Sequence, residues 1–153
     1  SFIASGHNIN GLRCQMFRLL KDMNDENIYY LDVERRNGGY LSYEEYRNIT
    51  RESKIGISIQ GEGYDTYRYL EVPFFNSLLM ADVPTIYIPN NFTDMVNAVF
   101  FKNLMEFQEK LNILKSNPDM ITKITEAGYK FLMENHTSLH RAQYVINELD
   151  KIK

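Results

Sequence analysis

The sequence predicts an α/β fold, in which a parallel sheet of about five strands is covered by helices on both faces. Short runs rich in β-branched and aromatic residues alternate with segments in which apolar residues recur at helical spacing. The connections are short, and crossovers between parallel strands are right-handed. The 153 residues are enough for one hydrophobic core, so we expect a single domain over 1–153 with a helical carboxyl-terminal part.

The chain opens with a predicted strand, helix and strand. The first strand covers 2–5, and a turn-rich loop over 5–11 leads into the helix. A second strand over 28–33 is rich in aromatic and β-branched residues. The helix between them is indicated by apolar residues at helical spacing, namely Leu12, Met16, Leu19, Leu20 and Met23.

A capping box marks the start of the second helix. The Ser42 hydroxyl and the Glu45 carboxylate are spaced to satisfy free backbone amides at a helix start. This helix should run to about Glu52 and lead into a third strand over 55–59. Beyond a glycine-rich loop, the apolar pattern predicts a helix over 68–80.

The rest of the chain should hold two more strands and three helices. The strands are predicted over 84–88 and 98–101. Asn117 and Pro118 separate the first two helices, since proline suits the first helical turn. The helices are indicated by three apolar stripes: Leu104, Phe107, Leu111 and Leu114; Ile121, Ile124, Gly128, Phe131 and Leu132; and Leu139, Ala142, Val145, Ile146 and Leu149.

Charge and composition exclude several classes of protein. The net charge is −3 and the pI is about 5.6, which argues against a large nucleic-acid footprint. No apolar stretch approaches the length that crosses a bilayer, and no secretion signal opens the chain. Cys14 is the single cysteine and lies in an apolar helical pattern, so we expect a buried thiol and a cytoplasmic, reducing compartment.

The histidines do not predict a metal site. His136 and His140 are four residues apart, but Asn135 and Thr137 look like a helix break and a cap between them. No third ligand stands nearby in the sequence, so we expect neither a metal nor a cofactor.

The most informative segment is the loop and helix start that follow the third predicted strand. Arg68 and Glu71 are three residues apart, which places both on one face of a helix at the carboxyl edge of the sheet. The arginine suits a phosphate, and the carboxylate suits sugar hydroxyls. In the preceding loop, Glu62 stands between Gly61 and Gly63, a position that also suits a sugar. The alternatives are a local ion pair for Arg68 and Glu71 and a solvated loop carboxylate for Glu62.

Two other loops at the same edge could contribute to a nucleotide site. Gly6 lies in the loop before the first helix, and Arg13 lies in the first helical turn, where an anion is favoured. Tyr40 follows a glycine pair and could stack on a base. A solvated Arg13 and a plain surface loop at Tyr40 are the alternatives. The Gly6 loop matches neither a dinucleotide fingerprint nor a P-loop, which counts against dinucleotide and ATP sites.

Four segments, in their order and spacing, carry a resemblance to a known family: 43–58, 67–71, 117–128 and 136–142. The second contains Arg-x-x-Glu at Arg68 and Glu71, and the last contains His-Thr followed by Arg141. Together they resemble the carboxyl-terminal, donor-binding domain of GT-B-fold glycosyltransferases. The likeness covers nearly the whole chain and is to the group 1 kind found in CgeB-like and capsule-type enzymes.

The resemblance implies roles for the residues of the Arg-x-x-Glu segment. It implies that Glu71 binds the ribose hydroxyls of a nucleotide-sugar and that Arg68 lies near the diphosphate or orients Glu71. In the family's related Glu-x7-Glu pattern, the earlier glutamate would fall at Gly63, one residue beyond Glu62. The family tends to have small residues after the ribose glutamate, where this chain has a proline and two phenylalanines at 73–75.

The resemblance as a whole implies a Rossmann-like donor domain that binds a nucleotide-sugar and needs no obligate metal. Because the chain starts with Ser1, we interpret it as the carboxyl-terminal half of a two-domain enzyme. The amino-terminal domain would hold the glycan or lipid-linked acceptor, the catalytic base and any contact with a membrane, so this part alone should turn over little. The alternatives are a non-catalytic nucleotide-binding or scaffold domain of the same fold and a flavodoxin-like regulatory module.

Overall fold

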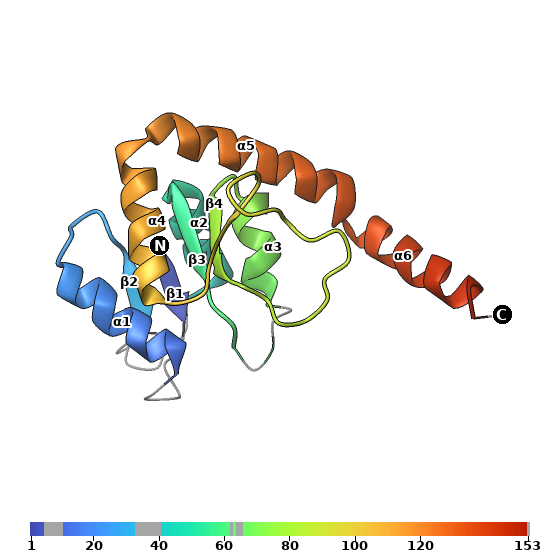
Figure 1. The fold of residues 1–153 in the computed structure, drawn as a ribbon, viewed down its shortest axis with the longest axis horizontal. Coiled ribbons are helices and arrows are strands. Elements are labelled where there is room, and N and C mark those ends of the chain that lie inside the picture. Colours follow the sequence, from blue (N-terminus) through green and yellow to red (C-terminus); the bar gives the residue numbers. More distant parts are fainter. Residues whose placement is uncertain (5–10, 33–40, 62, 64–65, 153) are drawn as a thin grey trace.

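The computed structural model describes residues 1–4, 11–32, 41–61, 63 and 66–152, and over them it shows alternating strands and helices (Figure 1). The strands are β1 (Phe2–Ala4), β2 (Tyr30–Asp32), β3 (Ile55–Ser58), β4 (Leu78–Asp82) and β5 (Val99–Phe101). The helices are α1 (Leu12–Met23), α2 (Tyr43–Glu52), α3 (Tyr67–Phe74), α4 (Leu104–Ser116), α5 (Pro118–Asn135) and α6 (Ser138–Asp150).

All strand pairs in the described part of the chain are parallel, which confirms the predicted sheet. β1 pairs with β2, while β4 lies between β3 and β5. β1 also lies beside β3, because the Ile57 amide donates to the Ser1 carbonyl at 2.9 Å. The five strands therefore follow the spatial order β2-β1-β3-β4-β5, and this order reverses between β1 and β3.

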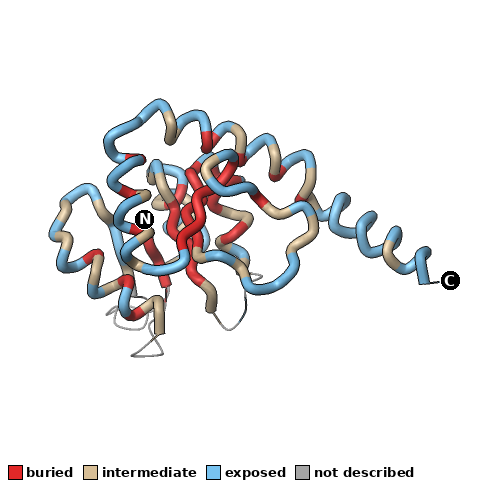
Figure 2. Tube along the Cα trace, in the orientation of Figure 1, coloured by how far each residue is buried: buried red, intermediate tan, exposed pale blue. Residues whose placement is uncertain are grey.

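Helices cover both faces of the sheet, as predicted. Successive side chains of β4 belong to two different hydrophobic clusters, because neighbouring residues of a strand point to opposite faces. Leu78 and Met80 pack in the first cluster, with residues of α1 and α4. Leu79 and Ala81 pack in the second cluster, with residues of α3 and α5. Figure 2 shows the buried residues concentrated on these central strands.

The fourth strand is β4 at Leu78–Asp82, so the predicted strand over 84–88 was wrong, and the helix predicted over 68–80 is confirmed only as far as Phe74. α3 ends at Phe74, and Asn76 then adopts a left-handed conformation with φ 60° that stops the helix. β4 is buried on both faces, so its residues form a continuous apolar run without alternation. Residues 84–88 form an irregular, mostly exposed segment instead.

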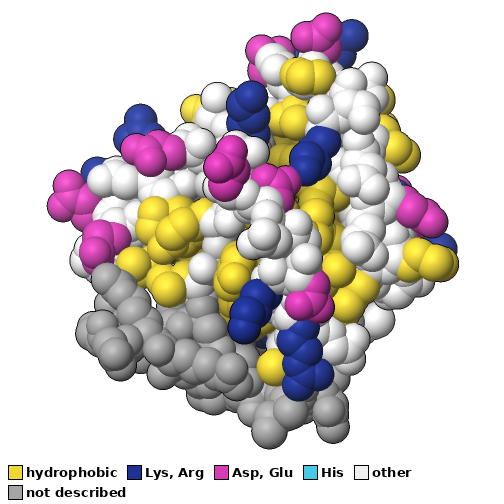
Figure 3. Space-filling model, turned by 90° about the vertical axis from the view of Figure 1, so that its left-hand side faces the viewer, with side chains coloured by type: hydrophobic (Ala, Val, Ile, Leu, Met, Phe, Trp, Pro, Cys, Tyr) yellow, Lys and Arg dark blue, Asp and Glu magenta, His cyan; other side chains and the backbone are white. Residues whose placement is uncertain are grey.

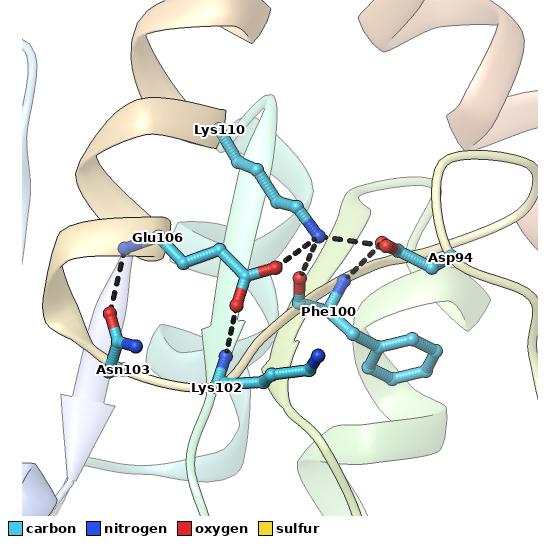
Figure 4. Close-up of polar contacts among 6 residues, drawn as sticks. All are labelled: Asp94, Phe100, Lys102, Asn103, Glu106 and Lys110. Atoms are coloured by element: carbon cyan, nitrogen blue, oxygen red, sulfur yellow. Dashed lines mark hydrogen bonds and ion pairs between the residues drawn. The ribbon is translucent and has the colours of Figure 1, made fainter.

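The connection from β4 to β5 is fixed to α4 by Lys110 (Figure 4). The Lys110 ammonium donates to the Asp94 carboxylate at 2.8 Å and to the Phe100 carbonyl at 2.5 Å. It also pairs with Glu106 at 3.0 Å, and that carboxylate accepts the Lys102 amide at 2.8 Å. Burial opposes the charge of this amine, but its two carboxylate partners raise the pKa of Lys110.

Replacing Lys110 with methionine should lower the free energy of unfolding by about 1 to 2 kcal/mol, because carboxylate and carbonyl oxygens lose a charged donor. Urea denaturation followed by circular dichroism measures this loss. Lys130→Met is the matched control, since Lys130 also faces a glutamate one turn away but is 76% exposed. Equal losses in the two variants would show that the Lys110 network contributes nothing specific.

α6 extends away from the rest of the molecule and leaves a row of apolar side chains in solvent (Figure 1). None of the described residues of α6 is buried. Its exposed apolar residues are Leu139, Val145, Ile146 and Leu149.

On the face shown in Figure 3, acidic and basic side chains are interspersed with apolar ones. Within the described ranges, no helix is both long enough and apolar enough to cross a bilayer.

Candidate functional site

The strand order points to one edge of the sheet as the place for a ligand. Open parallel sheets bind ligands beyond the carboxyl ends of their strands, at the point where the strand order reverses. Here that point lies between the ends of β1 and β3, and α1 and α3 begin in the connections that follow these strands. Neither helix has a side-chain cap at its amino terminus, where Gly11 and Thr66 are the cap residues. Such uncapped amides favour an anion.

Arg13 connects α1 to the connection that follows β3. Its Nε and Nη2 atoms donate to the Ile59 carbonyl at 3.3 and 3.0 Å. Gly61 lies so close that a Cβ atom there would be 2.6 Å from Arg13 Nη2. A side chain at position 61 would therefore push the guanidinium away, so the glycine permits this arrangement. The sequence left open a solvated Arg13, whereas in the structure its guanidinium binds the Ile59 carbonyl.

Three charged residues from three elements influence one another at this edge. Burial lowers the pKa of Arg13 most, the charge of Arg68 lowers it further, and the charge of Asp82 raises it. Asp82 ends β4, and its carboxylate accepts the Gln60 amide at 3.0 Å. Burial raises the pKa of Asp82, whereas the Gln60 amide and Arg13 lower it. Arg13 and Arg68 offer two guanidinium groups at this edge, and such groups suit a phosphate or diphosphate.

Arg68 and Glu71 meet a third side chain, Tyr46 of α2. The Arg68 guanidinium carbon lies over the Tyr46 ring, 5.7 Å from its centre. Burial raises the pKa of Tyr46 to about 12, and the neighbouring Arg68 and Glu71 lower and raise it, respectively. Among the described residues, none lies within ordinary hydrogen-bond distance of the Tyr46 hydroxyl or of Arg68 Nε, although Glu71 and Arg68 are near enough to the hydroxyl to shift its pKa. The structure therefore brings Glu71, Arg68 and Tyr46 together.

Of the remaining predicted site residues, only Gly63 belongs to the part of the chain that the structure describes. Gly6, Tyr40 and Glu62 lie outside the described residues, so their predicted roles stay predictions. Gly63 is exposed, and its carbonyl accepts the Gly61 amide at 3.2 Å. A Cβ atom at Gly63 would meet nothing within 4 Å, so space alone does not require glycine there.

Asp82 and Tyr46 are site residues that the sequence did not reveal. Asp82 could have been found as the polar residue that ends a buried apolar run, but that run was interpreted as a helix. Tyr46 carried no local signal, because only the packing of α2 against α3 brings it to Arg68.

The histidines and the cysteine have other surroundings. The ring of His136 donates from Nε2 to the Asn90 carbonyl at 2.8 Å, and His140 contacts Thr137. Cys14 is buried, as predicted. Within the described ranges, no three His, Cys, Asp or Glu side chains gather to hold a metal. A groove beside His136, where α5 meets α6, includes none of Arg13, Arg68 and Glu71.

Comparison with known proteins gives the same fold. The sequence pattern of a family described as "Glycosyl transferase-like" matches residues 13–147. A crystal structure of the C-terminal domain of a glycosyl transferase group 1 family protein from Francisella tularensis is similar, with a TM-score of 0.61 and 16% sequence identity. That similarity covers 87% of this chain and 66% of the other, and a search of curated proteins finds no match. Because the family pattern spans most of its length, the chain belongs to the glycosyl transferase-like family.

Proposed function

We propose that this chain is the donor-binding domain of a glycosyltransferase and that it holds a nucleoside-diphosphate sugar at the carboxyl edge of its sheet. The observation that carries the proposal is that Arg13 and Arg68, from two different helices, lie near enough where the strand order reverses for the charge of Arg68 to lower the pKa of Arg13. Family membership supports a transferase in general terms. We place the chain with the CgeB-like and capsule-type enzymes of polysaccharide biosynthesis in the cytoplasm.

In this proposal, the two arginines act on the diphosphate. Transfer of the sugar leaves a nucleoside diphosphate with additional negative charge, and guanidinium groups fixed beforehand stabilise that charge. Arg13 is held by Ile59, and the uncapped amino terminus of α1 adds its dipole to the same place. With these groups in position, an obligate metal is not needed.

Glu71 is the proposed ligand of the ribose. It lies one helical turn beyond Arg68 on α3, so a nucleotide whose diphosphate contacts Arg68 can present its ribose to Glu71. A carboxylate accepts hydrogen bonds from two neighbouring hydroxyls, as the ribose 2′ and 3′ positions offer. The acceptor, a glycan or a lipid-linked sugar, and the catalytic base would belong to an amino-terminal domain.

A second candidate is a non-catalytic nucleotide-binding domain. The residues after Glu71 favour it, because Phe74 is 51% exposed and Phe75 is buried where the family tends to have small residues. Both candidates share the nucleotide site. They differ in whether the complete protein transfers a sugar.

Thermal shift with UDP-, GDP-, TDP- and CMP-sugars, each with and without EDTA, tests the proposal. We expect one nucleotide to raise the melting temperature and EDTA to leave that rise unchanged. Glu71→Gln should weaken affinity about tenfold or more, which removes about 1.4 kcal/mol of stabilisation at a given excess of nucleotide. Glu126→Gln on α5 is an exposed control.

Two results would contradict the proposal. No stabilisation by any of these nucleotides would exclude a donor site. A rise that disappears with EDTA would show that binding depends on a metal, which the two arginines should make unnecessary.

A further inference from the structure

Side chains of α2 and α3 carry buried polar atoms without a partner. Among the described residues, the buried side-chain atoms without a hydrogen-bond partner are the Tyr46 hydroxyl, Arg47 Nε and Arg68 Nε. Buried polar groups are almost always paired, so each exception calls for an explanation. Two of the three belong to side chains that touch each other, since the Arg68 guanidinium lies over the Tyr46 ring. Both side chains border Glu71, the proposed ribose ligand.

Tyr46 is held on a rigid element. It lies in the first turn of α2, where its amide donates to the Ser42 carbonyl at 3.0 Å. Ser42 itself forms the capping box with Glu45, which fixes the amino terminus of the helix. At the other end of α2, the hydroxyl of Ser77, which directly precedes β4, donates to the Thr50 carbonyl at 2.8 Å. A side chain that projects from such an anchored helix can fix the position of its neighbours.

The hydroxyl of Tyr46 keeps its proton at neutral pH. Burial raises the pKa of Tyr46 to about 12, and the negative charge of Glu71 also raises it. The Tyr46 hydroxyl can therefore donate a hydrogen bond, and the charged acceptor near it is the Glu71 carboxylate. That carboxylate has two oxygens, so it can accept from Tyr46 and still bind a ligand hydroxyl.

We propose that Tyr46 is a positioning residue of the nucleotide site: its ring supports the Arg68 guanidinium, and its hydroxyl donates to Glu71 when the ribose is bound. In the ligand-free protein the Glu71 carboxylate already acts on this hydroxyl, and a full hydrogen bond would hold the carboxylate in place for the ribose. This inference rests on the proposed function, because it gives Tyr46 a role that acts through Glu71.

The test is a double-mutant cycle in nucleotide binding. Calorimetric titrations with UDP, GDP and CMP, each beside its 2′-deoxy form, compare the wild type with Tyr46→Phe, Glu71→Gln and the double variant. Tyr43→Phe is the matched control, because Tyr43 lies in the same helix but is 63% exposed. Tyr46→Phe keeps the ring beneath Arg68 and removes only a hydroxyl with no partner at ordinary hydrogen-bond distance, so it should fold as well as the wild type.

We expect Tyr46→Phe to weaken the binding of the preferred ribonucleotide about fivefold, the effect of one ordinary hydrogen bond. The preference for ribose over deoxyribose should shrink in Tyr46→Phe and in Glu71→Gln. The double variant should bind no more weakly than Glu71→Gln alone, because Tyr46 acts through that carboxylate. A loss of ribose preference is a change that general destabilisation of the fold does not produce.

Each of the other possible results excludes one part of the proposal. If Glu71→Gln weakens binding while Tyr46→Phe behaves as Tyr43→Phe does, the role of Tyr46 is excluded and the donor site stands. If the losses of the two single variants add in the double variant, Tyr46 does not act through Glu71. If the wild-type protein binds none of the nucleotides, the proposed function fails and the role of Tyr46 fails with it.

Discussion

Gly128→Ala should lower the free energy of unfolding by about 1 to 3 kcal/mol, even though alanine is the better helix former. Gly128 lies in α5 against the segment that precedes β5. A Cβ atom there would lie 2.6 Å from the Asn97 carbonyl oxygen, closer than real Cβ atoms approach. The helix and this segment can make contact only because position 128 has no side chain.

The carbonyl that Gly128 faces cannot easily move aside. The Asn97 side-chain oxygen accepts the Thr93 amide at 2.6 Å, and the Asn97 amide donates to the Thr93 carbonyl at 3.2 Å. Asn97 is also buried and lies two residues before β5 begins. An added methyl group must therefore displace α5. The dense packing of the protein interior resists such a shift.

Urea denaturation of Gly128→Ala, followed by circular dichroism, measures the effect. Glu126→Ala is the control, because Glu126 is exposed two residues earlier in the same helix. It should change stability by less than about 0.5 kcal/mol. If Gly128→Ala were as stable as the wild type or more so, the close packing of α5 on Asn97 would be wrong.

Lowering the pH from 7.5 to 5 should destabilise the protein through His136. His136 is 8% exposed, and its ring packs against Phe92 and Phe131, with centroid distances of 5.4 and 5.7 Å. Burial lowers the pKa of His136, the hydrogen bond to Asn90 opposes this, and the charges of Arg141 and His140 add to it. The folded protein therefore holds this histidine neutral, with the proton on Nε2.

The sign of the pH effect follows from linkage. In the unfolded chain, histidine takes up a proton near pH 6.5, whereas the folded protein does so only at lower pH. The stabilisation by neutral His136 is complete above pH 6.5 and is lost as the pH falls through the folded pKa. Within that window the free energy of unfolding falls by at most about 1.4 kcal/mol per pH unit.

Urea denaturation at several pH values between 5 and 7.5 measures this slope. His136→Gln carries no titrating group, so its slope should be smaller than that of the wild type. His140→Gln is the comparison variant, since His140 is exposed and hydrogen-bonds the Thr137 cap, so it should keep most of the slope that His136 produces. A wild-type slope that persists in His136→Gln would assign the pH dependence to other groups.

The sequence predicted the parts of the fold that local patterns determine. The capping box of Ser42 and Glu45 formed as expected, because both bonds lie within one helical turn. β4 was missed because a strand buried on both faces has no alternation, and Phe74 and Phe75 continued the helical spacing beyond the true end of α3. The fold class could still be predicted, since the neighbouring elements were correct.

The residues of the candidate site likewise fall into some that the sequence predicted and some that it did not. Arg13 and Arg68 could be predicted to share one edge, because each follows a parallel strand and such strands end together. Tyr46 and Asp82 could not, because their places depend on contacts between α2 and α3 and on the position of β4. Residues brought in by tertiary packing leave no trace in local spacing.

The isolation of α6 has a consequence for how this protein's stability is measured. A helix with no buried residue contributes little to the cooperative core, and such segments open with a small free energy of their own. We therefore expect the melting transition to report mainly the sheet and the helices packed on it, and α6 to open separately at lower free energy. A ligand or partner that orders α6 alone would leave the melting temperature unchanged and would show itself in hydrogen exchange of the helix amides.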